Sequence, residues 1–76
     1  MDYTVLVHPA AEGGYWTEVP ALPGCLSQGE TIEEALANTR EAIESHIAVL
    51  HEDGGEVSGD EGLLIGRVHV NVVPAA

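Results

Sequence analysis

The side chains of this chain that could do chemistry are thirteen Asp and Glu residues, four His residues and one Cys. A nuclease would need carboxylates that converge on two metal ions from a first strand, a helix and a last strand. The segments predicted as first and last strands, residues 3–8 and 63–73, contain no Asp or Glu. The acidic residues lie mostly in turns and on the predicted helix, so the pattern argues against a metal-dependent nuclease.

The cysteine and the histidines do not match a known catalytic or metal-binding pattern. Cys25 follows a Pro-Gly pair in a very acidic chain that would disfavour a reactive thiolate, so we expect a buried structural thiol. His46 and His51 are five residues apart on the predicted helix and therefore point to different sides. His8 and His69 could lie side by side on the first and last strands, but a structural zinc site needs four ligands. We expect no enzyme activity, no metal site and no cofactor.

Size and composition predict one small domain that spans residues 1–76. A chain of this length buries only about 60% of its unfolded surface, and one cysteine cannot form an internal disulfide. We therefore expect a homo-oligomer, either a dimer or a tetramer. No apolar run approaches the roughly 18 residues that cross a membrane, and the first residues lack the basic start of a secretory leader. These features predict a cytoplasmic protein that does not contact membranes.

The charge is strongly negative. Only Arg40 and Arg67 oppose the thirteen acidic side chains, which gives a formal net charge of −11. Such a charge would repel phosphate backbones, so we expect no direct binding to nucleic acid. Two explanations remain open: solubility, including adaptation to a salty cytoplasm, and a positively charged protein partner.

Strand signals occur in the first third of the chain and at its end. The first two segments are separated by a Pro-Ala-Ala-Glu-Gly-Gly turn, and Pro20 and a Pro-Gly pair end the second. Alternating valines in residues 63–73 predict a final strand that Pro74 ends. The three early strands are predicted at residues 3–8, 15–19 and 25–28.

One helix is predicted between the third strand and an acidic, glycine-rich loop. Thr31 and Glu34 fit the N-terminal capping box, and Gly54 fits the residue that ends the helix. Thr39 and His46 are expected on the flank of the apolar stripe. That stripe has helical spacing and consists of Ile32, Ala35, Leu36, Ile43, Ile47 and Leu50.

The predicted fold class is α+β with the order β-β-β-α-β. Three strands form an antiparallel meander, and the crossover through the helix favours a last strand parallel to the first. The helix covers one sheet face, where its Leu36, Ile43, Ile47 and Leu50 are expected to meet Val5, Val7, Tyr15, Val19, Val68 and Val70. The uncovered face is the candidate surface for a partner or for oligomer contacts, and it would carry Leu6, His8, Trp16, Glu18, Arg67 and His69.

One ordered set of motif residues runs from the second predicted strand into the start of the predicted helix. It consists of Gly14, Tyr15, Pro20, Leu22, Pro23, Gly24, Cys25, Gly29, Glu30, Thr31, Glu33, Glu34, Ala35 and Leu36. This set resembles the HicB-type antitoxin family. The resemblance implies a partial, degenerate ribonuclease-H-like fold without a catalytic role. It also implies a homo-oligomer that binds a small basic toxin of the HicA type, which cleaves messenger RNA, and occludes its active site.

The resemblance has one departure. Many family members continue into a C-terminal DNA-binding module, whereas this sequence stops at Ala76, three residues after the predicted last strand. We therefore expect a short member that does not bind operator DNA through this chain. An alternative stays open at this point: an orphan HicB-like oligomeric domain that binds another protein or a small ligand.

Overall fold

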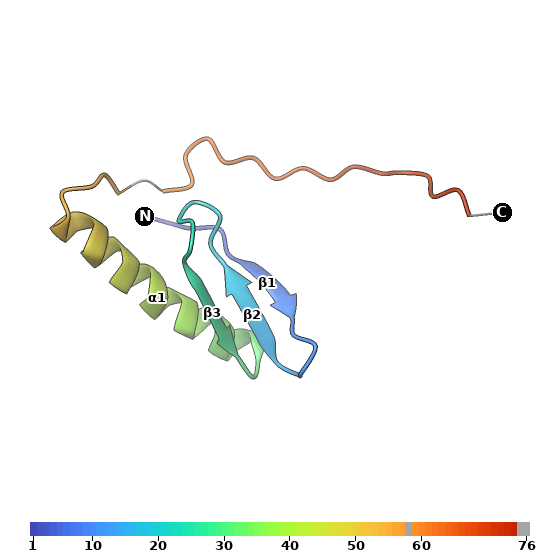
Figure 1. Ribbon diagram of the computed structural model, residues 1–76, viewed down its shortest axis with the longest axis horizontal. Helices are drawn as coiled ribbons and strands as arrows, with labels where there is room; N and C mark the ends of the chain where they lie inside the picture. The colour runs from blue at the N-terminus through green and yellow to red at the C-terminus, as the bar shows by residue number, and fades with distance from the viewer. Residues whose placement is uncertain (58, 75–76) are drawn as a thin grey trace.

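A computed structural model describes residues 1–57 and 59–74 of the chain. Its elements follow one another as β1 (Leu6–Pro9), β2 (Tyr15–Glu18), β3 (Leu26–Gly29) and α1 (Ile32–Glu52), as Figure 1 shows. The three early strands and the helix were therefore predicted correctly, with strand ends that differ by at most three residues.

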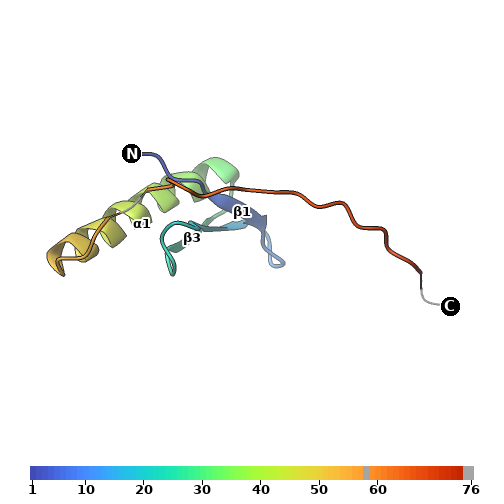
Figure 2. The same ribbon diagram turned by 90° about the horizontal axis from the view of Figure 1, so that it is seen from above.

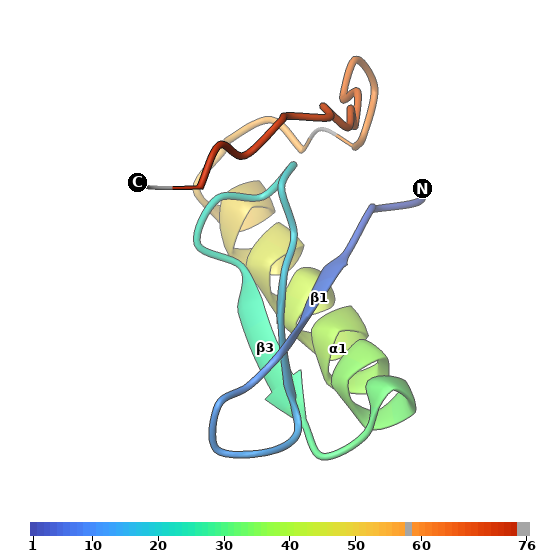
Figure 3. The same ribbon diagram turned by 90° about the vertical axis from the view of Figure 1, so that its right-hand side faces the viewer.

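The strands form an antiparallel sheet in the order β1-β2-β3, so β1 and β3 are its edges. His8 lies opposite Trp16, and Trp16 lies opposite Gln28. Because side chains alternate between the two faces of a sheet, this register determines which side chains share each face. Helix α1 lies against the other face, where it packs mainly on β3 and β2 (Figures 2 and 3). The face opposite α1 carries Leu6, His8, Trp16, Glu18, Leu26 and Gln28.

Two consecutive turns between β2 and β3 form the centre of the core. The amide of Leu22 donates to the carbonyl of Val19 over 3.0 Å, and the amide of Cys25 donates to the carbonyl of Leu22 over 3.0 Å. Gly24 has a φ of +86°, which suits the third position of a type II turn after a proline. The turns bury Val19, Leu22 and Cys25 together, and Tyr3, Val5, Ala42, Ile43, Ile47 and Leu50 pack around them.

Both ends of α1 are capped by the residues that the sequence predicts. The Thr31 hydroxyl accepts a hydrogen bond from the amide three residues further along, over 3.1 Å. At the other end Gly54 has a φ of +74°, and its amide donates to the carbonyl of His51. The amide of Gly55 donates to the carbonyl of Leu50, which completes a Schellman motif. Local sequence alone therefore defines the length of this helix.

The contact between α1 and the sheet is unusually close. A Cβ atom on Gly29 would lie 2.4 Å from the backbone nitrogen of Ala35, which is itself completely buried. One turn further, the hydroxyl oxygens of Thr17 and Thr39 lie 2.6 Å apart, and both side chains are buried. The Thr39 hydroxyl donates to the carbonyl of Ala35, so the Thr17 hydroxyl donates to Thr39. Small side chains and a paired polar contact therefore join helix and sheet at this point.

The predicted last strand is wrong for this structure. Residues 63–74, which we call the arm, leave the sheet as an extended segment, and no fourth strand occurs in residues 1–57 and 59–74 (Figure 1). Val68 and Val70, predicted in the core, are 87% and 67% exposed. Alternating valines predict a strand with one apolar side, but they do not specify which edge it pairs with.

Two predictions for α1 also need correction. Leu36, predicted to face the sheet, is 42% exposed, whereas Thr39, predicted on the flank, is buried against β2. The helix lies over β2 and β3, so its contact stripe passes through Ala35 and Thr39, and Leu36 faces the side of β1. Val19 is fully buried as predicted, while Val5, Val7 and Tyr15 are partly buried.

Candidate functional site

The sheet face opposite α1 carries an ordered cluster of ring and carboxylate groups. The rings of His8 and Trp16 are stacked, with centroids 4.1 Å apart and planes inclined by 17°. The Nε2 atom of His8 lies 2.8 Å from a carboxylate oxygen of Glu18. The antiparallel register explains this cluster, because His8 lies directly opposite Trp16 and Glu18 is its diagonal neighbour on the same strand as Trp16, β2. Ring stacking and the hydrogen bond together hold the Trp16 indole in one orientation.

The same face is apolar around Trp16. Trp16 is 38% exposed and Leu26, on the neighbouring strand, is 58% exposed. These two side chains, with Ser27 and Gln28, line a shallow hollow of about 370 Å³. A solvent-facing tryptophan beside a leucine on a rigid sheet is the kind of surface that protein partners use as an anchor.

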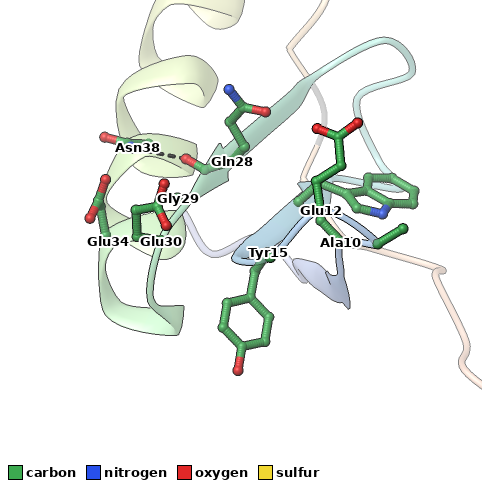
Figure 4. A pocket seen from close by; sticks show the side chains of 11 residues that line it. Ala10, Glu12, Tyr15, Gln28, Gly29, Glu30, Glu34 and Asn38 are labelled. Carbon is green, nitrogen blue, oxygen red and sulfur yellow. Dashed lines mark hydrogen bonds between the residues drawn. The ribbon is translucent and has the colours of Figure 1, made fainter.

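A second hollow lies at the end of the sheet, beside the β1–β2 turn and the start of α1. Glu12 stands on one side of it and Glu30 and Glu34 stand on the other (Figure 4). The amide group of Asn38 donates to the carbonyl of Gln28 over 2.8 Å and fixes one wall. Trp16 lines this hollow as well, so it borders the sheet face. The surface that can receive a partner is therefore apolar at its centre and acidic at its end.

Basic groups are sparse around this surface. Arg40 is on α1, which covers the opposite face, and it faces Glu44 at 3.8 Å. Arg67 belongs to the arm, which leaves the sheet (Figure 1). The charged groups around this surface are therefore mainly carboxylates, Glu18 on the face and Glu12, Glu30 and Glu34 at the end hollow, and such a surface favours a cationic partner.

The structure brings together only part of the predicted surface. Leu6, His8, Trp16 and Glu18 share one face, as predicted. Arg67 and His69 were expected beside them on a fourth strand, and this placement is wrong because the arm is not paired with β1. Sequence reasoning missed Leu26 and Gln28, although strict alternation along the third strand, read from its pairing with the second, would have found them.

The motif residues form the scaffold under this surface. Gly24 sits in the second turn, and Pro20 and Pro23 occupy the second positions of the two turns. Thr31 and Glu34 start α1, and Tyr15 borders the acidic hollow. Four further motif residues are packed inside the body between sheet and helix or within the turns: Leu22, Cys25, Gly29 and Ala35. The motif residues Glu30, Glu33 and Leu36 are exposed.

Burial also determines the chemistry of the one thiol. Cys25 is 4% exposed, and burial raises the pKa of its thiol above the ordinary value. A raised pKa keeps the group protonated and unreactive at neutral pH. Its role is therefore to fill the core between the two turns.

Neither a metal cluster nor a membrane span is found in the part of the chain that the structure describes. Within residues 1–57 and 59–74, no three His, Cys, Asp or Glu side chains are grouped closely enough to hold a metal ion. In the same residues no helix has both the length and the hydropathy needed to cross a bilayer.

Comparisons with known proteins agree on one family. Residues 3–65 match the family model described as HicB-like antitoxin of bacterial toxin-antitoxin system. A UPF0150 protein of Thermoplasma acidophilum is 43% identical over 60 residues, which cover 79% of this chain and 87% of that protein. Antitoxin HicB 1 of Photorhabdus laumondii is 37% identical over 57 residues, which cover 75% of this chain and 37% of that antitoxin.

A solved structure gives the same result for the fold. The N-terminal domain of the Burkholderia pseudomallei antitoxin HicB is 42% identical, with a TM-score of 0.69, over 83% of this chain and 79% of that domain. The family model spans well over half of the chain, and its members are antitoxins without enzyme activity. This chain therefore belongs to the HicB-like antitoxin family of bacterial toxin-antitoxin systems.

Proposed function

We propose that this protein neutralises a small basic, RNA-cleaving toxin of the HicA type in the cytoplasm. The sheet face opposite α1 binds the toxin and covers its active site. One observation carries this proposal above the others: an exposed Trp16, held by His8, on a sheet face that carries the carboxylate of Glu18 and no lysine or arginine.

The apolar centre of the face supplies affinity. Partner contacts are dominated by a few large side chains in desolvated positions, with tryptophan enriched among them. Trp16 fits this role because its ring is oriented before binding, so little side-chain entropy is lost on contact. Leu26 extends the apolar area on the neighbouring strand.

The acidic surroundings supply selectivity for a basic partner. Glu18 lies on the face, and Glu12, Glu30 and Glu34 line the hollow at its end. A toxin that cleaves RNA must attract phosphates, so its active-site surface is expected to be basic. Complementary charges raise the association rate and reject acidic competitors.

The proposal is tested by purifying the small basic protein from any neighbouring gene of the HicA type and titrating its RNA-cleavage assay with the full chain. We expect cleavage to stop at a stoichiometric ratio, with no cleavage by this chain alone. Undiminished cleavage, with no complex on a sizing column, would refute the antitoxin role and leave an orphan binding domain.

Substitutions on the face locate the contact. Trp16→Ala should weaken toxin binding by about 2 kcal/mol, roughly 30-fold, while the helix content stays unchanged. Val49→Ala is the matched control, because Val49 is 57% exposed on α1, away from the face. If both variants bind the toxin as tightly as the parent chain, the toxin occupies another surface.

Charge is tested in the same way. Glu18→Gln should slow association with the toxin, and the effect should shrink as salt is added. Glu41→Gln removes the same charge from an exposed position on α1 and should leave the association rate nearly unchanged. Equal effects of the two changes would show that only net charge matters.

A further inference from the structure

We propose that the arm, residues 63–74, pairs with the β1 edge of a second copy of this chain and fills the groove between β1 and α1 there. Two copies exchange their arms reciprocally and form a dimer. This inference concerns contacts between identical chains and does not depend on the toxin.

The receiving groove lies where the helix leaves β1 uncovered. It measures about 710 Å³ and combines apolar side chains of α1 with the segment that leads into β1. Leu36 is 42% exposed there, and β1 is an edge of the sheet with an unpaired row of backbone groups. An added strand would satisfy that edge and cover the exposed side of the helix. Its apolar lining consists of Met1, Tyr3, Val5, Leu36, Ile43 and Ile47.

The arm has the sequence of such a strand. It carries six large apolar side chains that are exposed to solvent, an arrangement that soluble proteins rarely leave in water. Alternation places Val68, Val70 and Val72 on one side, which can face the groove. The large apolar residues of the arm that are more than half exposed are Leu64, Ile65, Val68, Val70, Val72 and Val73.

The arm is also long enough. Twelve extended residues span about 40 Å, whereas residues 3–9, which include β1, span about 23 Å. One arm can therefore follow the whole length of the β1 edge, with residues to spare for the crossing between two copies.

The start of the arm is fixed, and its direction leads away from its own groove. Asp60 accepts hydrogen bonds from the backbone amide and the hydroxyl of Thr4, the latter over 2.6 Å. A turn follows, in which the amide of Leu63 donates to the carbonyl of Asp60 over 2.8 Å and Gly62 has a φ of +86°. Beyond it the arm extends away from the sheet, as Figures 1 and 2 show. The same molecule therefore exposes both an apolar arm and an apolar groove. In a reciprocal exchange between two identical chains, each arm would cover the groove of the other chain.

Net charge favours the approach of the arm to a second copy. All thirteen acidic residues precede the arm, and Arg67 is its one charged residue, so residues 1–62 carry −12 and residues 63–76 carry +1. The groove is bordered by Asp2, Glu44 and Arg40, and Arg67 lies on the side of the arm that faces away from it, so the attraction is one of net charge between the two copies. A cationic arm is therefore the one part of this chain that a second, very acidic copy attracts.

Exchange would also complete the candidate site. If the valine side of the arm faces α1, its opposite side carries Arg67 and His69 and lies beside Leu6 and His8 of the other copy. The predicted surface of six residues would then form from two chains instead of one.

The decisive experiment mixes unlabelled and ¹⁵N-labelled full-length Leu6→Cys/His69→Cys protein. The mixture is unfolded and refolded together, then treated briefly with a short bismaleimide and digested for mass spectrometry. We expect about half of the peptides linked between positions 6 and 69 to combine one light and one heavy half. Links only within one isotope would show that the arm returns to its own chain, and absence of this link would show that it does not pair with β1; either result overturns the proposal.

A second measurement tests the apolar side of the arm. Val70→Asp should raise the dimer dissociation constant in sedimentation experiments roughly 100-fold, because it buries an unpaired charge. Asn71→Asp adds the same charge on the other side and should change the constant by about threefold or less. Both positions are exposed in the single chain, so both variants should keep their helix content. Equal dimerisation of the two variants, or a monomeric parent chain, would overturn the proposal.

Discussion

Two parts of this chain, the motif segment at residues 14–36 and the arm at residues 63–74, contain strand-forming sequence but differ in how they are held. In the motif segment each turn and cap has its partner within a few residues, such as the Thr31 hydroxyl on the third amide of the helix. In the arm the valines alternate equally well, yet Val68 is 87% exposed. Local hydrogen bonds hold the motif segment in place. The arm can become a strand only by pairing with the edge of a sheet, and its own sequence does not determine which edge that is.

The two parts also differ in how closely they approach their neighbours. In the motif segment Gly29 lies so near Ala35 that no Cβ fits between them, whereas a Cβ on Gly66 in the arm would meet nothing within 4 Å. The resemblance to the antitoxin family therefore rests mainly on residues that pack the body. The surface that would meet a partner lies outside those residues, apart from Tyr15 and the acidic residues that border the end hollow.

The difference in packing between the two parts can be tested by adding one methyl group to each of them. Gly29→Ala should lower the free energy of unfolding by about 3 kcal/mol, because its Cβ would lie 2.4 Å from the backbone nitrogen of Ala35. Gly66→Ala is the matched change in the arm and should stay within about 0.5 kcal/mol of the parent. Urea unfolding followed by circular dichroism measures both.

An equal effect of the two glycine changes would contradict the difference in packing. A small loss at Gly29 would mean that β3 and α1 can move apart without cost. The comparison is made at a concentration low enough for the chain to be monomeric, where a large loss at Gly66 would mean that the arm packs within its own chain.

The next largest effect concerns the buried hydrogen bond between Thr17 in the motif segment and Thr39 on α1. Thr39→Val should cost about 1–3 kcal/mol, because it leaves the buried Thr17 hydroxyl without its 2.6 Å partner. The double variant Thr17→Val/Thr39→Val should cost clearly less than the two single changes added together. Additive losses would show that the two hydroxyls do not depend on each other.

Much of the fold could be predicted because its signals are local. The cap at Thr31, the stop at Gly54 and the two proline turns each depend on neighbouring residues. Alternation correctly placed Trp16 on the uncovered face. The position of α1 across the sheet depends on the close contact at Gly29, which no periodic pattern shows, so Thr39 was expected on the flank and is buried.

The candidate site was predicted in part for the same reason. Leu6, His8, Trp16 and Glu18 share a face because period-two alternation determines it. Arg67 and His69 depended on where a distant strand would pair, and a pairing partner cannot be derived from the strand's own alternation.

A smaller effect tests how far the motif segment depends on its cap. Thr31→Ala should lower stability by about 1 kcal/mol, because the amide at the third helical position loses its acceptor. Ser45→Ala, in the exposed middle of α1, should be neutral or slightly stabilising, since alanine has the higher helix propensity. Equal melting temperatures for the two variants would show that the helix start is held by packing alone.

The smallest expected effect concerns Cys25, which lies under the second turn of the motif segment. Burial raises the pKa of its thiol, so the folded chain binds this proton more tightly than the unfolded chain does. The resulting stability is complete below the pKa of the thiol in the unfolded chain and is lost as pH rises through the higher pKa of the folded chain. Alkylation by iodoacetamide at pH 8 should therefore be much slower in the folded chain than in urea, whereas a cysteine introduced by His69→Cys in the exposed arm should react at nearly the same rate in both. Rapid alkylation of Cys25 in the folded chain would show that the double turn opens readily. The motif segment and the arm would then differ only in how often each is exposed to solvent.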